Sequence, residues 1–147
     1  MNSAAQQRDQ SEVESVSRQA QEALAAKDWT AAVKFLERFA ELAPNLSEVQ
    51  GDLGLAYYSE NRILEASKAF ERALKLNRKM TRAETMLGLC YAELGRNQQA
   101  VPILVSAFRR PPDCRLGRLI GLDLQRAYVG LQQYVKAMAV AEELLKR

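Results

Sequence analysis

The chain has 147 residues, 48% of them hydrophobic, and a net charge of +3. This length can bury a core without disulfides or metal, and so small a charge does not demand a nucleic-acid partner. Histidine is absent, which removes the commonest general base and metal ligand, and no glycine-rich phosphate loop occurs. We therefore expect no catalytic residue, no metal site and no cofactor, and hence a protein that is not an enzyme.

The N-terminus lacks the apolar stretch of a signal peptide, and no run of 18 apolar residues occurs in the chain. We therefore expect no membrane insertion, and the compartment stays open between cytoplasm and periplasm. The polar composition of residues 1–10 predicts a disordered tail, followed by a single domain over residues 11–147.

A first pair of helices is expected over residues 13–46. Ser11 and Glu14 have the spacing of a capping box at its start, and Asp28 is placed to cap the second helix of the pair.

The next two pairs, over residues 47–80 and 81–114, repeat each other. Leu53-Gly54-Leu55-Ala56-Tyr57 recurs 34 residues later as Leu87-Gly88-Leu89-Cys90-Tyr91. The small Gly and Ala residues allow two helices to approach closely, and the tyrosines fill the space between successive pairs with the phenol at a polar rim. Ser47…Gln50 and Thr81…Glu84 have capping-box spacing, Asn97 is placed to cap a second helix, and Gly95 suits a left-handed helix end.

A fourth pair is expected over residues 118–147, with Leu124, Tyr128 and Ala137 at the repeated positions. Here the register changes, because Tyr91 and Tyr128 are 37 residues apart. Three extra residues are nearly one helical turn, so the first helix is expected to start a turn early, capped by Asp113. Gly130 suits its left-handed end.

These residues resemble the signature of the tetratricopeptide repeat, a helix–turn–helix unit of 34 residues. The resemblance implies an all-α fold: a right-handed superhelical solenoid of antiparallel helix pairs, with about four repeats and eight helices in one tetratricopeptide domain. No stretch alternates with period two, so no sheet is expected.

The resemblance also implies that the first helices of the repeats line a concave binding face. The positions carried over to that face are Gln21, Asp52, Leu55, Tyr58, Arg82, Met86, Leu89, Leu122 and Arg126, with Asp123 and Val129 beside the last two. Apolar anchors with charged edges suit an extended peptide or an amphipathic helix. Leu55 and Leu89 follow a packing glycine, so a place in the core is an equal alternative for both.

Chaperone-tail adaptors of this family clamp a terminal carboxylate with a set of basic and amide side chains. Of the matching positions here, only Arg82 has the right character, and Asp52 would repel a carboxylate. The groove is neither basic nor aromatic, so a nucleic-acid partner is not expected.

Outward positions of the second helices become apolar along the chain. Ser67 and Glu71 of the second repeat are replaced by Val101 and Val105 in the third, and Met138 follows in the fourth. An apolar outer face is expected to be covered, and our first choice is a homodimer through Val101, Val105 and Met138.

The sequence therefore predicts a non-enzymatic scaffold or adaptor that binds a protein or peptide ligand in its concave groove. The alternative is a regulatory or assembly domain excised from a larger protein, enzymatic or envelope-associated.

Overall fold

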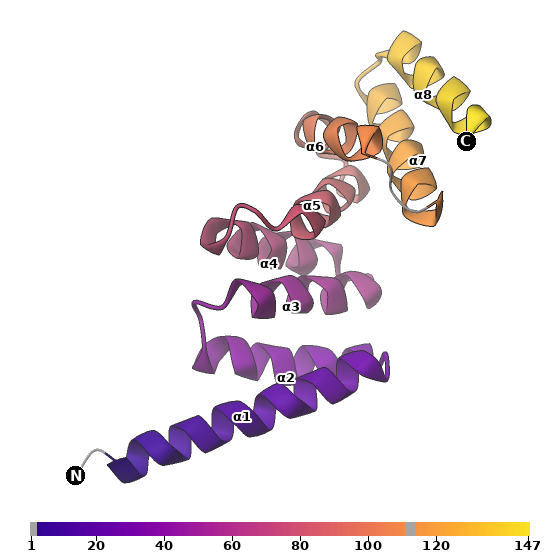
Figure 1. The fold of residues 1–147 in the computed structure, drawn as a ribbon. Coiled ribbons are helices and arrows are strands. Elements are labelled where there is room, and N and C mark those ends of the chain that lie inside the picture. Colours follow the sequence, from indigo (N-terminus) through magenta and orange to yellow (C-terminus); the bar gives the residue numbers. More distant parts are fainter. Residues whose placement is uncertain (1–2, 111–113) are drawn as a thin grey trace. The chain divides into compact units, whose positions relative to one another are not determined.

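The computed structural model describes residues 3–110 and 114–147, and every regular element in them is an α-helix (Figure 1). The described residues form eight helices: α1 (Ser3–Ala25), α2 (Trp29–Leu42), α3 (Ser47–Ser59), α4 (Ile63–Leu76), α5 (Thr81–Glu93), α6 (Asn97–Arg109), α7 (Cys114–Gly130) and α8 (Tyr134–Lys146). The prediction of an all-α helical-repeat fold is confirmed. None of these helices is both long and apolar enough to cross a membrane.

The helices group into two compact units, residues 1–80 with α1–α4 and residues 81–147 with α5–α8. In the first unit α2 packs between α1 and α3, and α4 packs on α3 (Figure 1). In the second unit α6 and α8 pack on α7, and α5 contacts both α6 and α7. The second unit thus brings the first helices of its two pairs, α5 and α7, together.

The turn inside each helix pair has one left-handed residue at the same place: Lys27, Asn61, Gly95 and Gln132, with φ of 55°, 60°, 71° and 59°. Each is followed by a residue whose N–H donates to the carbonyl five residues earlier, at 2.8–3.0 Å, which closes the preceding helix. The prediction for Gly95 is confirmed. The prediction for Gly130 is wrong, because Gln132 takes the left-handed place and a side chain at position 130 would collide with the Asn97 amide.

Asp28 caps α2 as predicted, because its Oδ1 accepts the N–H of Ala31 at 3.1 Å. The predicted caps at Ser47 and Asn97 differ from the structure. Leu46 and Arg96 precede α3 and α6 without a side-chain bond, so Ser47 and Asn97 are already helical. The capping box at Ser47 does not form, because the hydroxyl of Ser47 bonds to Glu48.

Helices α1 and α7, the first helices of the first and fourth repeats, both begin earlier than a strict 34-residue repeat suggests. Helix α1 begins at Ser3, which corrects the expected disordered tail for residues 3–10 and the cap at Ser11. These residues are exposed, but good helix formers such as Ala, Gln and Arg extend an existing helix at little cost. Helix α7 begins at Cys114, about one turn before residue 118, as predicted. The expected cap Asp113 lies outside the described residues.

Close helix approaches depend on glycine. A Cβ at Gly54 would lie 2.7–2.9 Å from the Phe70 ring, and one at Gly88 would lie 2.7 Å from Ile103. In the last pair the close approach occurs one turn earlier, where a Cβ at Gly121 would meet Leu144 at 2.6 Å. The predicted packing role of Gly54 and Gly88 is confirmed.

Candidate partner-binding surface

In the first compact unit, three predicted groove residues share one side of α3. Asp52 is exposed, and Leu55 and Tyr58 are half-buried at successive intervals of three residues. Gln21 is exposed on α1. Because α2 packs between these helices, Gln21 stands apart from the α3 residues.

Tyr57 holds this side of α3 in place. Its hydroxyl donates a hydrogen bond to Glu37 of α2, and the Arg62 guanidinium lies 4.6 Å from its ring centroid. Burial, with the Glu37 carboxylate second, raises the pKa of Tyr57 to about 12. The tyrosine therefore stays a neutral donor, and the predicted polar rim is confirmed for this repeat.

In the second compact unit, Arg82 is exposed and Met86 is half-buried on α5, but Leu89 is completely buried. Glu93, one turn after Leu89, forms an ion pair with Arg126 of α7. The side of α5 that carries Leu89 therefore faces α7, which covers it. Leu89 belongs to the core, and its assignment to the groove is corrected.

Helix α7 exposes a line of mainly apolar side chains, which we call the α7 stripe: Leu119, Leu122, Arg126 and Val129. Their spacing of three, four and three residues places them on one helix side. Leu122 is 54% and Val129 47% exposed, which is high for aliphatic side chains in a helix that packs against three others. Sequence reasoning missed Leu119, although it lies 37 residues after Arg82 and so at the same repeat position as that predicted groove residue.

A charged cluster lies at the middle of the stripe. Arg126 Nη1 is 3.2 Å from Asp123 Oδ1 and 3.8 Å from Glu93 Oε1. The Asp123 side chain is only 1% exposed, and neither of its carboxylate oxygens accepts an aligned hydrogen bond within the structure. Burial raises the pKa of Asp123; Arg126 opposes this effect and Glu93 adds to it. Nothing in the sequence pattern indicated that Glu93 would join this site.

The predicted dimer residues lie on two helices. Val101 and Val105 are half-buried on α6, whereas Met138 is exposed on α8. Both helices pack on α7. Met138 lies beside Val135 and Leu145 on an exposed face of α8, which we call the α8 face.

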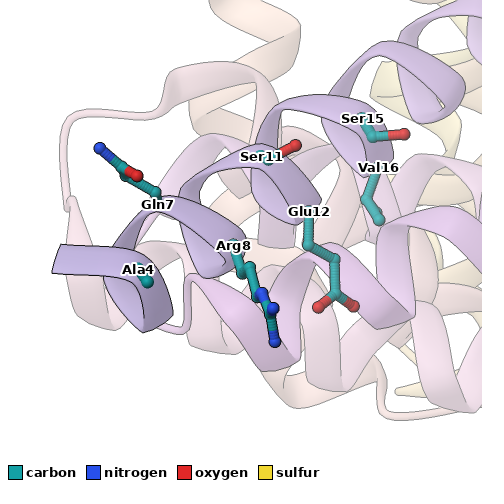
Figure 2. A pocket seen from close by; sticks show the side chains of 7 residues that line it. All are labelled: Ala4, Gln7, Arg8, Ser11, Glu12, Ser15 and Val16. Carbon is teal, nitrogen blue, oxygen red and sulfur yellow. The ribbon is translucent and has the colours of Figure 1, made fainter. Parts of the chain in front are cut away.

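A shallow hollow of about 530 Å³ runs along α1, lined by Ala4, Gln7, Arg8, Ser11, Glu12, Ser15 and Val16 (Figure 2). All seven residues come from one helix, and Glu12 holds Arg38 of α2 in an ion pair. With no opposing wall, this hollow is a helix surface and does not enclose a ligand.

The described residues offer little for chemistry. Cys90 is buried, as predicted, and burial raises the pKa of its thiol to about 12, so it stays protonated at neutral pH. Within residues 3–110 and 114–147, no three Cys, Asp or Glu side chains gather as metal ligands.

Comparison with known proteins identifies the repeat. Residues 47–80 match the sequence model described as tetratricopeptide repeat. No curated protein sequence matches the chain. Among solved structures, MamA 41-end from Desulfovibrio magneticus RS-1 has a TM-score of 0.70 at 24% identity, covering 90% of this chain and 75% of that chain. The Arabidopsis OM64 TPR domain has a TM-score of 0.65 at 18% identity, covering 78% and 93%.

A chain of the CopN-Scc3 complex has a TM-score of 0.61 at 19% identity, covering 74% of this chain and 66% of that chain. At these identities the likeness shows the fold. Tetratricopeptide repeats are generally interaction modules without catalytic activity. Residues 47–80 are therefore a tetratricopeptide repeat, in a chain with the all-α helical-repeat fold of protein-interaction modules of this kind.

Proposed function

We propose that this chain is a non-enzymatic scaffold that binds a peptide or helical segment of another protein on the first helices of its repeats. The observation that carries the proposal is the α7 stripe, three exposed aliphatic side chains around a charged centre. Grouped apolar side chains on one helix side are a common mark of a protein-interaction site. Repeat proteins use the face of their first helices for such contacts.

The other first helices support the same proposal. On α3, Leu55 and Tyr58 offer partly exposed apolar surface with Asp52 beside them, and on α5 Met86 lies one turn from Arg82. Apolar anchors with charged residues at the edge are the usual composition of an interface that holds a peptide. Each compact unit thus carries its own set of anchors.

The test is a capture experiment with the full chain on an array of 15-residue synthetic peptides of randomised sequence. We expect Tyr58→Ala and Arg82→Glu to reduce capture about tenfold, because each removes an interface contact. Circular dichroism and the melting temperature should stay nearly unchanged, because both residues keep solvent exposure. Lys68→Glu, an exposed change on the second helix α4, is the control and should capture as the unaltered chain does.

Capture that neither groove variant reduces would contradict the proposed surface, and so would the absence of any captured peptide. Unfolding of both groove variants would show that these residues belong to the core.

We also propose self-association of the chain through the α8 face. Leu145 corresponds to Phe108, 37 residues earlier, which is 5% exposed because α7 packs on it, whereas Leu145 is 89% exposed. Val135 and Met138 add to the same face at 83% and 64%. A second copy of the chain can cover such a face by two-fold symmetry. The alternative, a regulatory or assembly domain of a larger protein, would cover it with a different segment.

A further inference from the structure

We propose that Asp123 and Glu93 form a receptor for one lysine or arginine side chain of the partner segment, and that Arg126 occupies this receptor in the free protein. The inference rests on the proposed peptide-binding function and names the chemistry of the bound segment. It depends on the burial of Asp123, the charge around it and the apolar side chains on either side.

Asp123 is buried without the hydrogen bonds that a carboxylate normally accepts. Its side chain is 1% exposed, both oxygens lack an aligned donor, and Arg126 is its ion-pair partner at 3.2 Å. A buried carboxylate with incomplete hydrogen bonding is unfavourable, and a well-placed cationic donor would relieve it. The ammonium of lysine or the guanidinium of arginine supplies such donors.

The cluster holds one positive charge against two negative charges. The same Nη1 atom of Arg126 serves Asp123 at 3.2 Å and Glu93 at 3.8 Å, which leaves a net charge of −1. The Arg126 side chain is 62% exposed and can turn out into solvent, and its 3.8 Å pair with Glu93, which is 39% exposed, is weak. A cation from a partner can therefore displace Arg126, and the charge of the cluster favours that exchange.

The surroundings define the segment further. Leu122 and Val129 lie on either side of Arg126 along the α7 stripe and provide anchors for apolar side chains. Arg115 and Arg118 are exposed on the preceding turns and would repel further positive charges. The site thus fits a single basic residue flanked by apolar residues, and it disfavours a polybasic run.

The test uses the full chain and four sets of 11-residue peptides with leucine on both sides of a central Lys, Arg, Gln or Glu and uncharged residues elsewhere. We expect the Lys or Arg set to bind about tenfold more tightly than the Gln set, with the Glu set weakest. Asp123→Asn should remove the preference and leave binding of the Gln set unchanged. Arg126→Gln should strengthen binding of the basic sets severalfold, because the intramolecular competitor is gone.

Glu142→Gln, which removes one negative charge from the exposed surface of α8 in the same unit, is the matched control and should keep the full preference. Circular dichroism of each variant verifies that the helices are retained. Equal binding of the Lys and Gln sets, an undiminished preference in Asp123→Asn, or tightest binding of the Glu set would overturn this inference while the peptide-binding function stands. If no set binds, both proposals fail.

Discussion

The two compact units place the same residue type in opposite environments. Asp52 in the first unit and Asp123 in the second occupy equivalent repeat positions, yet Asp52 is exposed and Asp123 is buried. The difference follows from helix contacts within each unit. Helix α7 contacts α5, whose Glu93 reaches Arg126 next to Asp123, whereas in the first unit α2 packs between α1 and α3. Burial is therefore set by the neighbouring helix and not by the repeat position.

The units also differ in where glycine permits close approach. In the first unit Gly54 faces the rigid Phe70 ring. In the last pair of the second unit the close approach occurs at Gly121, one turn before the position that corresponds to Gly54. Gln125 stands at the usual glycine position there and is half-buried. Helix α7 thus has an extra turn at its start, and its closest contact with α8 lies one turn nearer to that start.

The largest effect is expected from overpacking the glycine contacts. Gly54→Leu and Gly88→Leu should each lower the free energy of unfolding by about 3 kcal/mol, because a Cβ would already lie within 2.7 Å of Phe70 or Ile103. Urea denaturation measures the free energy of unfolding of each variant. Gly51→Ala is the matched control on α3, since its Cβ would meet only the flexible end of Met80 at 3.0 Å. It should raise stability by about 0.5–1 kcal/mol through helix propensity. Equal loss at Gly51 and Gly54 would contradict this packing argument.

The next-largest effect is expected on self-association, and it differs between substitutions on α8 and on α6. Met138→Glu should weaken self-association about thirtyfold, or about 2 kcal/mol, because the new charge must be desolvated in a dimer. Sedimentation equilibrium measures the dissociation constant, and Met138→Leu is the conservative control. Val105→Glu is less specific, since Val105 is half-buried in α6 and the change would disturb folding as well. If light scattering shows that the unaltered chain is monomeric at high micromolar concentration, the proposed dimer is wrong.

A third prediction tests the buried carboxylate. Asp123→Asn should stabilise the protein at pH 7 by about 1 kcal/mol, because it removes a buried charge with incomplete hydrogen bonding. Since the pKa of Asp123 is raised in the folded state, the folded protein binds more protons than the unfolded chain between the ordinary and the raised value. The unaltered chain should therefore gain stability as the pH falls through that window, and the advantage of the variant should shrink.

Urea denaturation of both proteins from pH 4 to pH 8 measures this change. Glu142→Gln, on the exposed surface of α8, is the control for the loss of one negative charge. An advantage of Asp123→Asn that stays constant across the range would contradict the raised pKa.

The smallest effect concerns the turns. Lys27→Gly in the first unit and Gln132→Gly in the second should each raise the free energy of unfolding by about 0.5–1 kcal/mol, because φ near +60° strains a side-chain-bearing residue. Gly95→Ala should lower it by about 1 kcal/mol for the same reason. Thermal denaturation of the three variants checks the signs, and a loss of stability in both glycine variants would show that the side chains compensate the strain.

The sequence by itself determined the helix pairs and their packing residues. The 34-residue period located Gly54, Gly88 and Tyr57 correctly, and the 37-residue step predicted the early start of α7. Gly54 and Gly88 could be located because their close contacts, with Phe70 and Ile103, lie within a helix pair. Tyr57 could be located because its place between successive pairs recurs with the repeat period. The left-handed turn at Gly95 followed from local geometry in the same way.

Only the tertiary structure decided which of these residues are accessible. Leu55 and Leu89 have the same repeat position, but Leu55 is half-buried and Leu89 is completely buried under α7. The cluster of Glu93, Asp123 and Arg126 joins two helices about thirty residues apart in the sequence. No repeat pattern encodes such contacts, because the burial of a side chain depends on the helix that packs against it, and that helix differs from one repeat to the next.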